Sequence, residues 1–388
     1  MKRISVPERP GWKEQAEKLG FGFHTMYGAP YWDETRAYQF TLEEIERDLE
    51  DPSQELYGMC LDLVDRVVRD DALLEKMAIP QTYREWIRQS WENSEPSLYG
   101  RFDFFYDGTG PAKLLEFNAD TPTALYETGF FQWIWLEEQI AAGVIPQNSD
   151  QFNSVQDRLI ERFAAMFAPG YHIHFASSKD HDEDRATVRY LEDCAKQAGL
   201  TPHYVAVEDI GVDAEGRFAD KNAFVIDALF KLYPYEDMFR EDYGPFLPGS
   251  KVHLIEPPWK AILSNKAILP LLWEMFPGHP NLLPSYFDGE APAEFEASAF
   301  VRKPLFSREG ANITVRGLEG GDVTTPGSYG EEGHILQAYV EPPKFGDDYA
   351  MIGSWIVGGI ASGILIREDR EKITQDLSRF VPHIILDT

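Results

Sequence analysis

A short stretch of the chain gathers the residue types that commonly build a magnesium and phosphate site. Residues 101–118 read RFDFFYDGTGPAKLLEFN, in which apolar and polar side chains alternate on both sides of a DGTG turn. This pattern predicts a β-hairpin with its polar side chains on one face. If the hairpin folds about its middle, Asp103 lies opposite Glu116 and Arg101 lies opposite Asn118.

Two opposed carboxylates repel each other unless a cation lies between them. Directly opposed side chains on paired strands have Cβ atoms roughly 5 Å apart, and hard oxygen ligands with room for phosphate oxygens suit Mg²⁺. Two alternatives stay open at this point: a glycosidase-like acid and base pair, and a chance encounter in a chain with 65 acidic residues. The neighbouring arginine and amide favour the magnesium and anion interpretation.

The composition disfavours one class of partner. The 388-residue chain carries a formal net charge of −29, so no nucleic-acid partner is expected, because phosphate backbones are bound by basic patches. An acidic surface attracts cationic small molecules, although it also serves solubility alone. The length and the 43% hydrophobic content predict two or three subdomains around a substantial core.

The sequence also bears on location. Cys60 and Cys194 form no closely spaced pair, which is typical of a reducing compartment, and the N-terminus lacks the apolar stretch of a secretory signal. The uncharged segment 349–366 reaches the length of a membrane helix, but its glycines and the Gly358-Gly359 pair favour two strands joined by a turn. We therefore expect a cytoplasmic protein without a membrane partner, and the oligomeric state stays open.

The pattern of elements changes along the chain. It is mostly helical from 41 to about 142, and from about 151 helices alternate with strands, which is typical of an α/β layer with a parallel sheet. Further on, VRKPLFSREG (301–310) places Lys303 before a glycine-bearing turn and Arg308 within it, an arrangement that suits phosphate binding. A solvated basic loop is the ordinary alternative, and the chain has no Walker motif and no GxGxxG or GxSxG sequence.

Four separated blocks, taken in order, resemble the glutathionylspermidine synthase family of ATP-grasp ligases. They are RFDFFYDGTGPAKLLEFNADTPT, PPWKAILSNKAILPLLW, VRKPLFSREGAN and GSWIVGGIASGILIRED, which span 101–369. The resemblance implies an ATP-grasp fold of α+β and α/β units that hold ATP between them, with one unit as a mobile lid. Bifunctional members carry an amidase domain ahead of the synthetase, and no such domain is expected here.

The resemblance also implies roles for individual residues. The implied magnesium ligands are Asp103, Glu116 and Asn118, and the implied catalytic arginines are Arg101, Arg308 and Arg367. The implied nucleotide-binding residues are Arg101, Lys266, Lys303, Arg308 and Gly310, together with Gln337, Ala338, Tyr339 and Val340 as the adenine hinge. The implied substrate residues are Thr121, Thr123, Glu183, Asp184 and Glu236. For Glu183 and Asp184, the acidic first turn of a helix is an equally good explanation.

The resemblance also implies how the chain is divided into regions and which reaction it catalyses. The regions are an N-terminal helical region with the metal-binding hairpin (1–145), an α/β substrate-side domain (146–265), the lid (266–340) and C-terminal strands that complete the ATP site (341–388). With ATP and Mg²⁺ as cofactors, the implied reaction joins a glutathione-like acid to a polyamine-like amine through an acyl phosphate. Two alternatives stay open: a small-molecule kinase using the same cradle, and a non-catalytic ATP-binding scaffold.

Overall fold

A six-stranded sheet at the centre of the molecule joins distant parts of the sequence. The computed structural model describes residues 1–179, 181–374 and 378–387. The sheet has the order β21-β20-β19-β5-β6, with a short β18 pairing to β19, and every pairing is antiparallel. Its strands are β5 (Tyr99–Phe105), β6 (Lys113–Asn118), β18 (Lys344–Phe345), β19 (Asp348–Val357), β20 (Ile360–Asp369) and β21 (Arg379–Val381). The uncharged segment is thus two strands joined at Gly358-Gly359, which confirms the prediction.

The β5–β6 hairpin has the register that the alternation predicts. Asp103 pairs with Glu116 and Arg101 pairs with Asn118. A bulge after Asp103 shifts the pairing nearer the turn, where Phe104 pairs with Leu114. On the opposite face, Phe102 stacks on Phe117 with ring centroids 4.0 Å apart.

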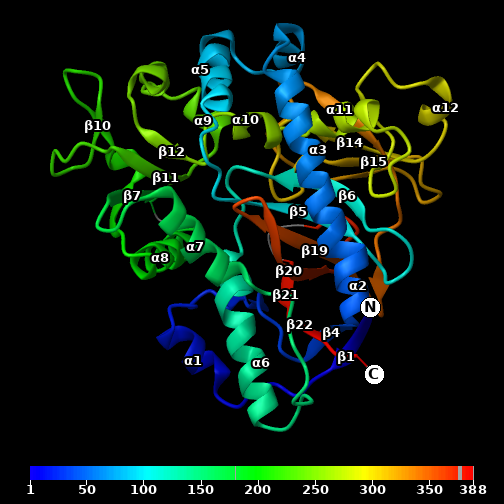
Figure 1. Ribbon diagram of the computed structural model, residues 1–388. Coiled ribbons are helices and arrows are strands. Elements are labelled where there is room, and N and C mark those ends of the chain that lie inside the picture. The colour runs from blue at the N-terminus through cyan, green and yellow to red at the C-terminus, as the bar shows by residue number, and fades with distance from the viewer. Residues whose placement is uncertain (180, 375–377, 388) are drawn as a thin grey trace.

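A long helix covers the apolar face of the central sheet. The helix α3 (Asp51–Val67) follows a capping box at Thr41 and Glu44 and a π-helical segment, Glu46–Glu50. Its buried stripe of Leu56, Cys60, Leu63 and Val67 shares one core with the phenylalanines of β5, and Figure 1 shows α3 crossing in front of the central sheet. The polar side chains of β5 and β6 therefore point to the other face.

Two further sheets flank the centre, one on each side in Figure 1. The four-stranded sheet, with the order β12-β11-β7-β8, is parallel, as the helix–strand alternation predicts; the five-stranded sheet, with the order β13-β17-β14-β15-β16, is antiparallel. The bounds are β7 (His172–Ser177), β8 (Thr201–Ala206), β11 (Ala228–Leu232), β12 (His253–Ile255), β13 (Ser285–Phe287), β14 (Phe300–Pro304), β15 (Thr314–Arg316), β16 (Val323–Thr324) and β17 (His334–Ala338). Helices α7 (Val155–Met166) and α8 (Asp182–Gln197) pack beside the parallel sheet.

The two ends of the chain meet in a small sheet that the sequence patterns did not predict. Strand β4 (Arg36–Phe40) pairs with β1 (Lys2–Ser5) and with β22 (His383–Ile385), and both termini lie near it in Figure 1. The remaining helices are α1 (Trp12–Lys18), α2 (Leu42–Ile45), α4 (Asp71–Lys76), α5 (Gln81–Glu92), α6 (Gln132–Ala141), α9 (Tyr235–Met238), α10 (Lys260–Leu263), α11 (Ile268–Met275) and α12 (Ala293–Glu296). Two short hairpins, β2 (Thr25–Met26) with β3 (Ala29–Pro30) and β9 (Gly211–Val212) with β10 (Phe218–Ala219), complete the elements discussed.

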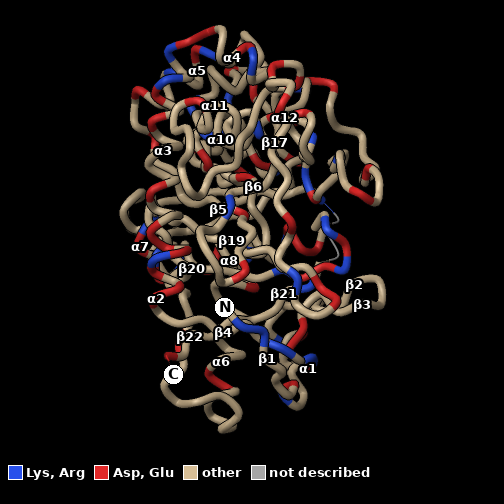
Figure 2. The backbone as a smooth tube through the Cα atoms, turned by 90° about the vertical axis from the view of Figure 1, so that its right-hand side faces the viewer, with Lys and Arg blue, Asp and Glu red and all other residues tan. Residues whose placement is uncertain are grey.

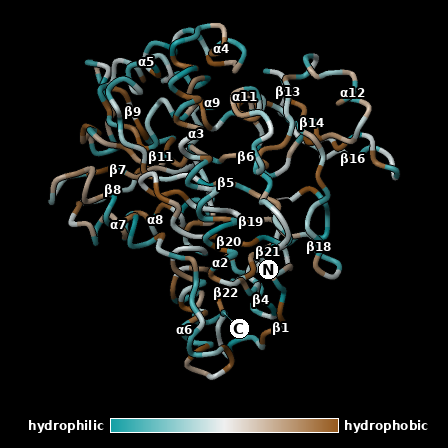
Figure 3. The backbone as a smooth tube through the Cα atoms, turned by 45° about the vertical axis from the view of Figure 1, so that its right-hand side comes forward, coloured by the Kyte–Doolittle hydropathy of each residue, from teal (hydrophilic) through white to brown (hydrophobic). Residues whose placement is uncertain are grey.

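Charge and hydropathy are both dispersed along the chain. Figure 2 shows basic segments interspersed with acidic ones, without a long basic stretch. Figure 3 shows hydrophilic and hydrophobic segments alternating along the backbone. Within the described residues, no helix has the length and apolar character needed to cross a bilayer.

Candidate active site

The polar face of the central sheet carries the predicted site residues from neighbouring strands. Arg101 and Asp103 come from β5, and Glu116 and Asn118 come from β6. Arg367 lies on β20, and its partner in register on β19 is Met351. The structure thus brings the predicted metal ligands and two of the three predicted catalytic arginines onto one surface.

Arg101 is fixed in place by several contacts. Its Nε donates to Oδ1 of Asp103 at 2.7 Å and its Nη2 donates to Oδ2 at 2.9 Å, while Nη1 donates to the carbonyl oxygen of Thr123 at 2.8 Å. The guanidinium also lies 5.6 Å from the ring centroid of Trp355. Burial opposes the charge of Arg101, but the neighbouring Asp103 raises the pKa of the arginine above its ordinary value. Because Nε and Nη2 bind the two oxygens of one carboxylate, this buried bidentate pair fixes the orientation of the guanidinium plane.

A glycine on β19 leaves the space that Arg101 occupies. Gly353 pairs in register with Asp103, and a Cβ atom at this position would lie 2.8 Å from Cδ of Arg101 and 2.9 Å from Cγ of Leu365. Because real side chains avoid contacts this short, Gly353 is part of what positions the arginine.

Two lysines from outside the sheet meet Glu116. Nζ of Lys266, just before α11, lies 3.1 Å from Oε2 of Glu116 and donates to the carbonyl oxygen of Ser307 at 2.8 Å. Although burial by itself raises the pKa of Glu116, the ammonium groups of Lys266 and Lys303 outweigh it and lower that pKa to about 2. Conversely, burial lowers the pKa of Lys303 to about 8 even with Glu116 nearby.

The metal-ligand set has the right chemistry for a hard cation. Nδ2 of Asn118 donates to Oδ2 of Asp103 at 2.9 Å and to Oε1 of Glu116 at 3.2 Å, so the amide holds the two carboxylates toward one another. Burial raises the pKa of Asp103, and the Glu116 charge raises it further against the opposing effect of Arg101. Among the described residues no group of three or more His, Cys, Asp or Glu side chains is arranged to hold a metal. Two carboxylates and an amide oxygen, completed by phosphate and water, are what Mg²⁺ sites in proteins typically contain.

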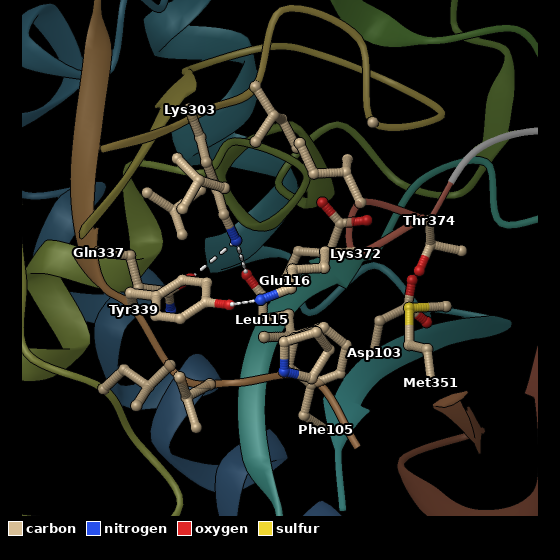
Figure 4. A pocket seen from close by; sticks show the side chains of 18 of the residues that line it. Asp103, Phe105, Leu115, Glu116, Lys303, Gln337, Tyr339, Met351, Lys372 and Thr374 are labelled. Carbon is tan, nitrogen blue, oxygen red and sulfur yellow. Dashed lines mark hydrogen bonds between the residues drawn. The ribbon is translucent and has the colours of Figure 1, made fainter. Parts of the chain in front are cut away.

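A largely apolar pocket lies beside these charges, between the central sheet and the five-stranded sheet (Figure 4). Its lining includes Asp103, Glu116, Lys266, Lys303, Gly310, Gln337, Ala338, Tyr339 and Val340, together with the apolar side chains of Phe105, Leu115, Leu283, Val301, Ile313, Val315 and Met351. The structure therefore gathers most of the predicted nucleotide-binding residues around one cavity.

Gln337, which is predicted for the adenine hinge, lines the pocket and makes two side-chain hydrogen bonds. Its Oε1 accepts a hydrogen bond from Nζ of Lys303 at 2.7 Å, and its Nε2 donates to the carbonyl oxygen of Leu114 at 3.1 Å. The side chain is buried and holds the lysine, which also donates to the carbonyl oxygen of Leu115 at 2.9 Å. Figure 4 shows the Gln337–Lys303 bond at the edge of the pocket.

The loop after β20 contributes residues to the pocket that sequence reasoning missed. Lys372, Ile373 and Thr374 line the same pocket, and Nζ of Lys372 donates to the hydroxyl of Tyr339 at 3.2 Å. A Cβ atom on Gly310 would lie 2.6 Å from the carbonyl oxygen of Thr374, so the glycine allows the 301–310 segment and this loop to touch. No motif marks these residues, because they sit outside the four resembling blocks.

Arg308 reaches from the predicted lid to the substrate side. Its Nη1 donates to Oγ1 of Thr121 and its Nη2 donates to Oε1 of Glu236, both at 2.8 Å. Burial disfavours its charge, but Glu236 raises the pKa of the arginine. Glu236, predicted to bind substrate, is thus paired with Arg308, and the pair ties the 301–310 segment to the start of α9.

A second cavity, of about 320 Å³, lies on the other side of the carboxylates. Its lining includes Arg101, Asp103, Glu116, Asn118, Thr121, Thr123, Asp184, Arg308 and Arg367, and three residues not predicted from the sequence, His181, Asp237 and Glu309. Burial raises the pKa of Asp184 to about 6, although His181 opposes the rise. Glu183 does not line this cavity; its Oε1 accepts from the hydroxyl of Tyr31.

A family model and several known proteins match this chain over most of its length. The family model described as glutathionylspermidine synthase preATP-grasp matches residues 3–386. A protein of Haemophilus influenzae, provisionally named an acid–amine ligase, is 40% identical over 399 residues, which cover 99% of both chains.

Two longer relatives are more distant. Trypanothione synthetase of Crithidia fasciculata is 29% identical over 82% of this chain, and the bifunctional glutathionylspermidine synthetase/amidase of Escherichia coli is 26% identical over 97% of it. The aligned part spans 52% and 63% of those two proteins. Among solved structures, a glutathione synthetase-like effector from Globodera pallida in its apo form has a TM-score of 0.56 at 12% identity, over 99% of this chain and 100% of that one. This likeness supports the ATP-grasp fold that the motifs implied.

Proposed function

The chain belongs to the glutathionylspermidine synthase family and is an ATP-dependent acid–amine ligase, and we propose that it joins a glutathione-like carboxylic acid to a polyamine-like amine through an acyl phosphate. The names of the relatives support the two substrate classes. We propose small molecules as its partners and the cytoplasm as its location.

One observation carries the acyl-phosphate route. Asp103 and Glu116 line both the nucleotide pocket and the 320 Å³ cavity, so the two cavities share one wall. A nucleotide in the first and an acid in the second would direct the terminal phosphate and the carboxylate toward the same residues. Bringing reactants together in this way lowers the entropic part of the barrier.

Phosphoryl transfer to a carboxylate brings two anions together, so the site must supply positive charge. Arg101 and Arg367 line the acid cavity, and Lys266 and Lys303 line the nucleotide pocket. We assign the arginines to the transferring phosphoryl group and the lysines to the phosphates of ATP. Arg308 closes the lid region, 266–340, over the acyl phosphate and keeps water away from it.

The carboxylate pair is our proposed magnesium site. Asp103, Glu116 and Asn118 would hold the ion, which would offset the negative charge of the phosphates when bound. Arg101 and Lys266 contact the same carboxylates in this structure, so these two cations already balance the charges that the ion would share.

The test is a substrate grid with mass-spectrometric detection. ATP, Mg²⁺ and the protein are incubated with peptide acids crossed with amines, including glutathione with spermidine, and both ADP and products are measured. A product lighter by one water than acid plus amine supports the proposal, and hydroxylamine should trap the activated acid as a hydroxamate. A stable phosphorylated product that needs no amine would favour the kinase alternative; ATP binding without turnover would favour the scaffold.

A further inference from the structure

Tyr31 and Glu127, which the sequence analysis did not single out, meet the predicted substrate residue Glu183 near the substrate cavity. The hydroxyl oxygen of Tyr31 lies 2.7 Å from Oε1 of Glu127 and 3.2 Å from Oε1 of Glu183. Tyr31 lies in the loop before β4, Glu127 begins the π-helical segment Glu127–Phe131, and Glu183 lies in the first turn of α8. Tyr31 and Glu127 are each 2% exposed, whereas Glu183 is half-buried.

The cluster has more acceptors than protons. A phenol carries one proton, so it donates to one of the two carboxylates at a time. Burial raises the pKa of Glu127 to about 7, and the Glu183 charge adds to the rise against the hydrogen bond from Tyr31. Burial, with both carboxylates, raises the pKa of Tyr31 well above its ordinary value. The tyrosine therefore stays protonated and passes protons on, while Glu127 gains or loses one near neutral pH.

The surroundings connect the cluster to the reacting groups. The charge of Arg367 opposes the rise in the pKa of both Glu127 and Tyr31, and Tyr31 also lies within electrostatic range of Arg101. Both arginines line the 320 Å³ cavity. On the other side, Glu183 is next to Asp184, which also lines the cavity. The other titratable groups beside the cluster are Tyr126, next to Glu127, and His181, beside Asp184.

The ring of Tyr31 is held in one position. It packs against Phe380 at 4.8 Å, Phe23 at 5.5 Å and Phe21 at 6.2 Å between centroids. Both backbone polar groups of Tyr31 are hydrogen-bonded. Its N–H donates to the carbonyl oxygen of His24, and its carbonyl oxygen accepts from the N–H of Phe380. A hydroxyl fixed between two carboxylates is preorganised for proton transfer.

We propose that Glu183, Tyr31 and Glu127 form a proton relay that accepts the proton lost by the amine substrate. The inference rests on the proposed function. The bound ammonium group first loses one proton, which frees its nitrogen to attack, and this is the proton that the relay accepts. When the nitrogen then bonds to the acyl carbon, the carbon–oxygen bond to phosphate breaks and the departing phosphate takes the second proton, so an uncharged nucleophile does not need the relay. Asp184, which lines the cavity, takes the first proton and passes it to the neighbouring Glu183. Glu183 then protonates the oxygen of Tyr31, which gives its own proton to Glu127. Tyr31 and Glu127 act through Glu183, so they are positioning residues rather than catalytic ones.

The experiment compares two nucleophiles in the same protein. Glutathione, ATP and Mg²⁺ are supplied with either spermidine, whose amines are protonated at neutral pH, or hydroxylamine, which is mostly uncharged there. The variants are Tyr31→Phe, Glu127→Gln and the double variant. Tyr126→Phe is the matched control, because it also removes one buried hydroxyl hydrogen bond, to the carbonyl oxygen of Leu19, without separating two carboxylates.

Each single variant should slow amide formation with spermidine by about 100-fold, within the range of general base catalysis, and leave hydroxamate formation close to wild type. The double variant should be no slower than either single one, because both break the same relay. The ratio of the wild-type to the Tyr31→Phe rate should rise as the pH approaches about 7, where Glu127 becomes free to accept a proton, and Tyr126→Phe should change neither rate.

Two results would overturn the relay: equal losses with both nucleophiles, which indicate that the cluster only orients the arginines, or no loss with either. Retained hydroxamate formation also serves as proof of folding in each variant. If the wild-type protein forms no hydroxamate and no amide, the proposed function itself fails, and this outcome is distinct from a relay that fails in an active enzyme.

Discussion

The space beside Gly353 gives the sharpest test of how the site is positioned. In Gly353→Ala, the new Cβ atom would start 2.8 Å from Cδ of Arg101, and ordinary contact begins at 3.4 Å. Arg101 or the strand must therefore move by about 0.6 Å. The 2.7 Å bond from Nε of Arg101 to Asp103 would stretch or turn by a similar amount.

The expected effect has two parts. Overpacking of a well-filled region typically costs about 1–3 kcal/mol of unfolding free energy, which lowers the melting temperature by several degrees. A displacement of about 1 Å of a catalytic group can cost about 100-fold in rate, so we expect kcat to fall by about 10- to 100-fold. The assays are thermal unfolding and ADP release under saturating ATP and substrates.

A matched variant on the neighbouring strand β5 separates the effect on position from the effect on stability. A Cβ atom on Gly100 would lie 2.8 Å from the ring of Phe117, on the face of the sheet that packs against α3. Gly100→Ala should therefore lose comparable stability and keep most of its kcat. If Gly353→Ala keeps full kcat, or if both variants lose activity equally, the reasoning that Gly353 positions Arg101 is refuted.

Three further outcomes are expected. Glu116→Ala should abolish turnover while circular dichroism shows an intact fold, and full activity would remove Glu116 from the proposed magnesium site. ATP affinity, measured by calorimetry, should fall as the pH rises through about 8, because the buried Lys303 loses its charge there, and Lys303→Arg should flatten this dependence; a flat wild-type profile would contradict the lysine's role. Glu236→Gln should weaken the salt bridge that holds Arg308 over the proposed acyl phosphate. Water would then hydrolyse more of this intermediate, so the ratio of ADP released to amide formed should rise. An unchanged ratio would show that the pair does not shield the intermediate.

The hairpin was predictable because its information is local. Alternation over two short strands and one turn fixes which side chains share a face, so the pairing of Asp103 with Glu116 and of Arg101 with Asn118 follows from the sequence and is confirmed. The same holds for the two strands around Gly358-Gly359. In both, neighbours in space are also near neighbours along the chain.

Contacts between distant segments were not predictable in this way. The hydroxyl of Tyr31 meets Glu127, 96 positions away, and Glu183, 152 positions away, and no periodic pattern reports such a meeting. The sheet formed by β1, β4 and β22 was missed for the same reason, since its strands come from the two ends of the chain. The partner of a single charged residue was also not predictable: Glu236 was predicted as a substrate residue, and its contact with Arg308, 72 positions away, is visible only in the fold.

The ion pairs at the shared wall explain how a site built for anions stays folded without them. Arg101 is paired with Asp103 and Lys266 with Glu116, so the cations that would meet phosphate are balanced by the carboxylates that would meet a metal ion. Removing one partner of such a pair leaves a buried charge uncompensated, which costs several kcal/mol. Because the phosphates and a metal ion would bring charges of opposite sign, the cations and the carboxylates can exchange partners at once. We infer that this balance is why the two carboxylates lie beside the two cations rather than apart from them.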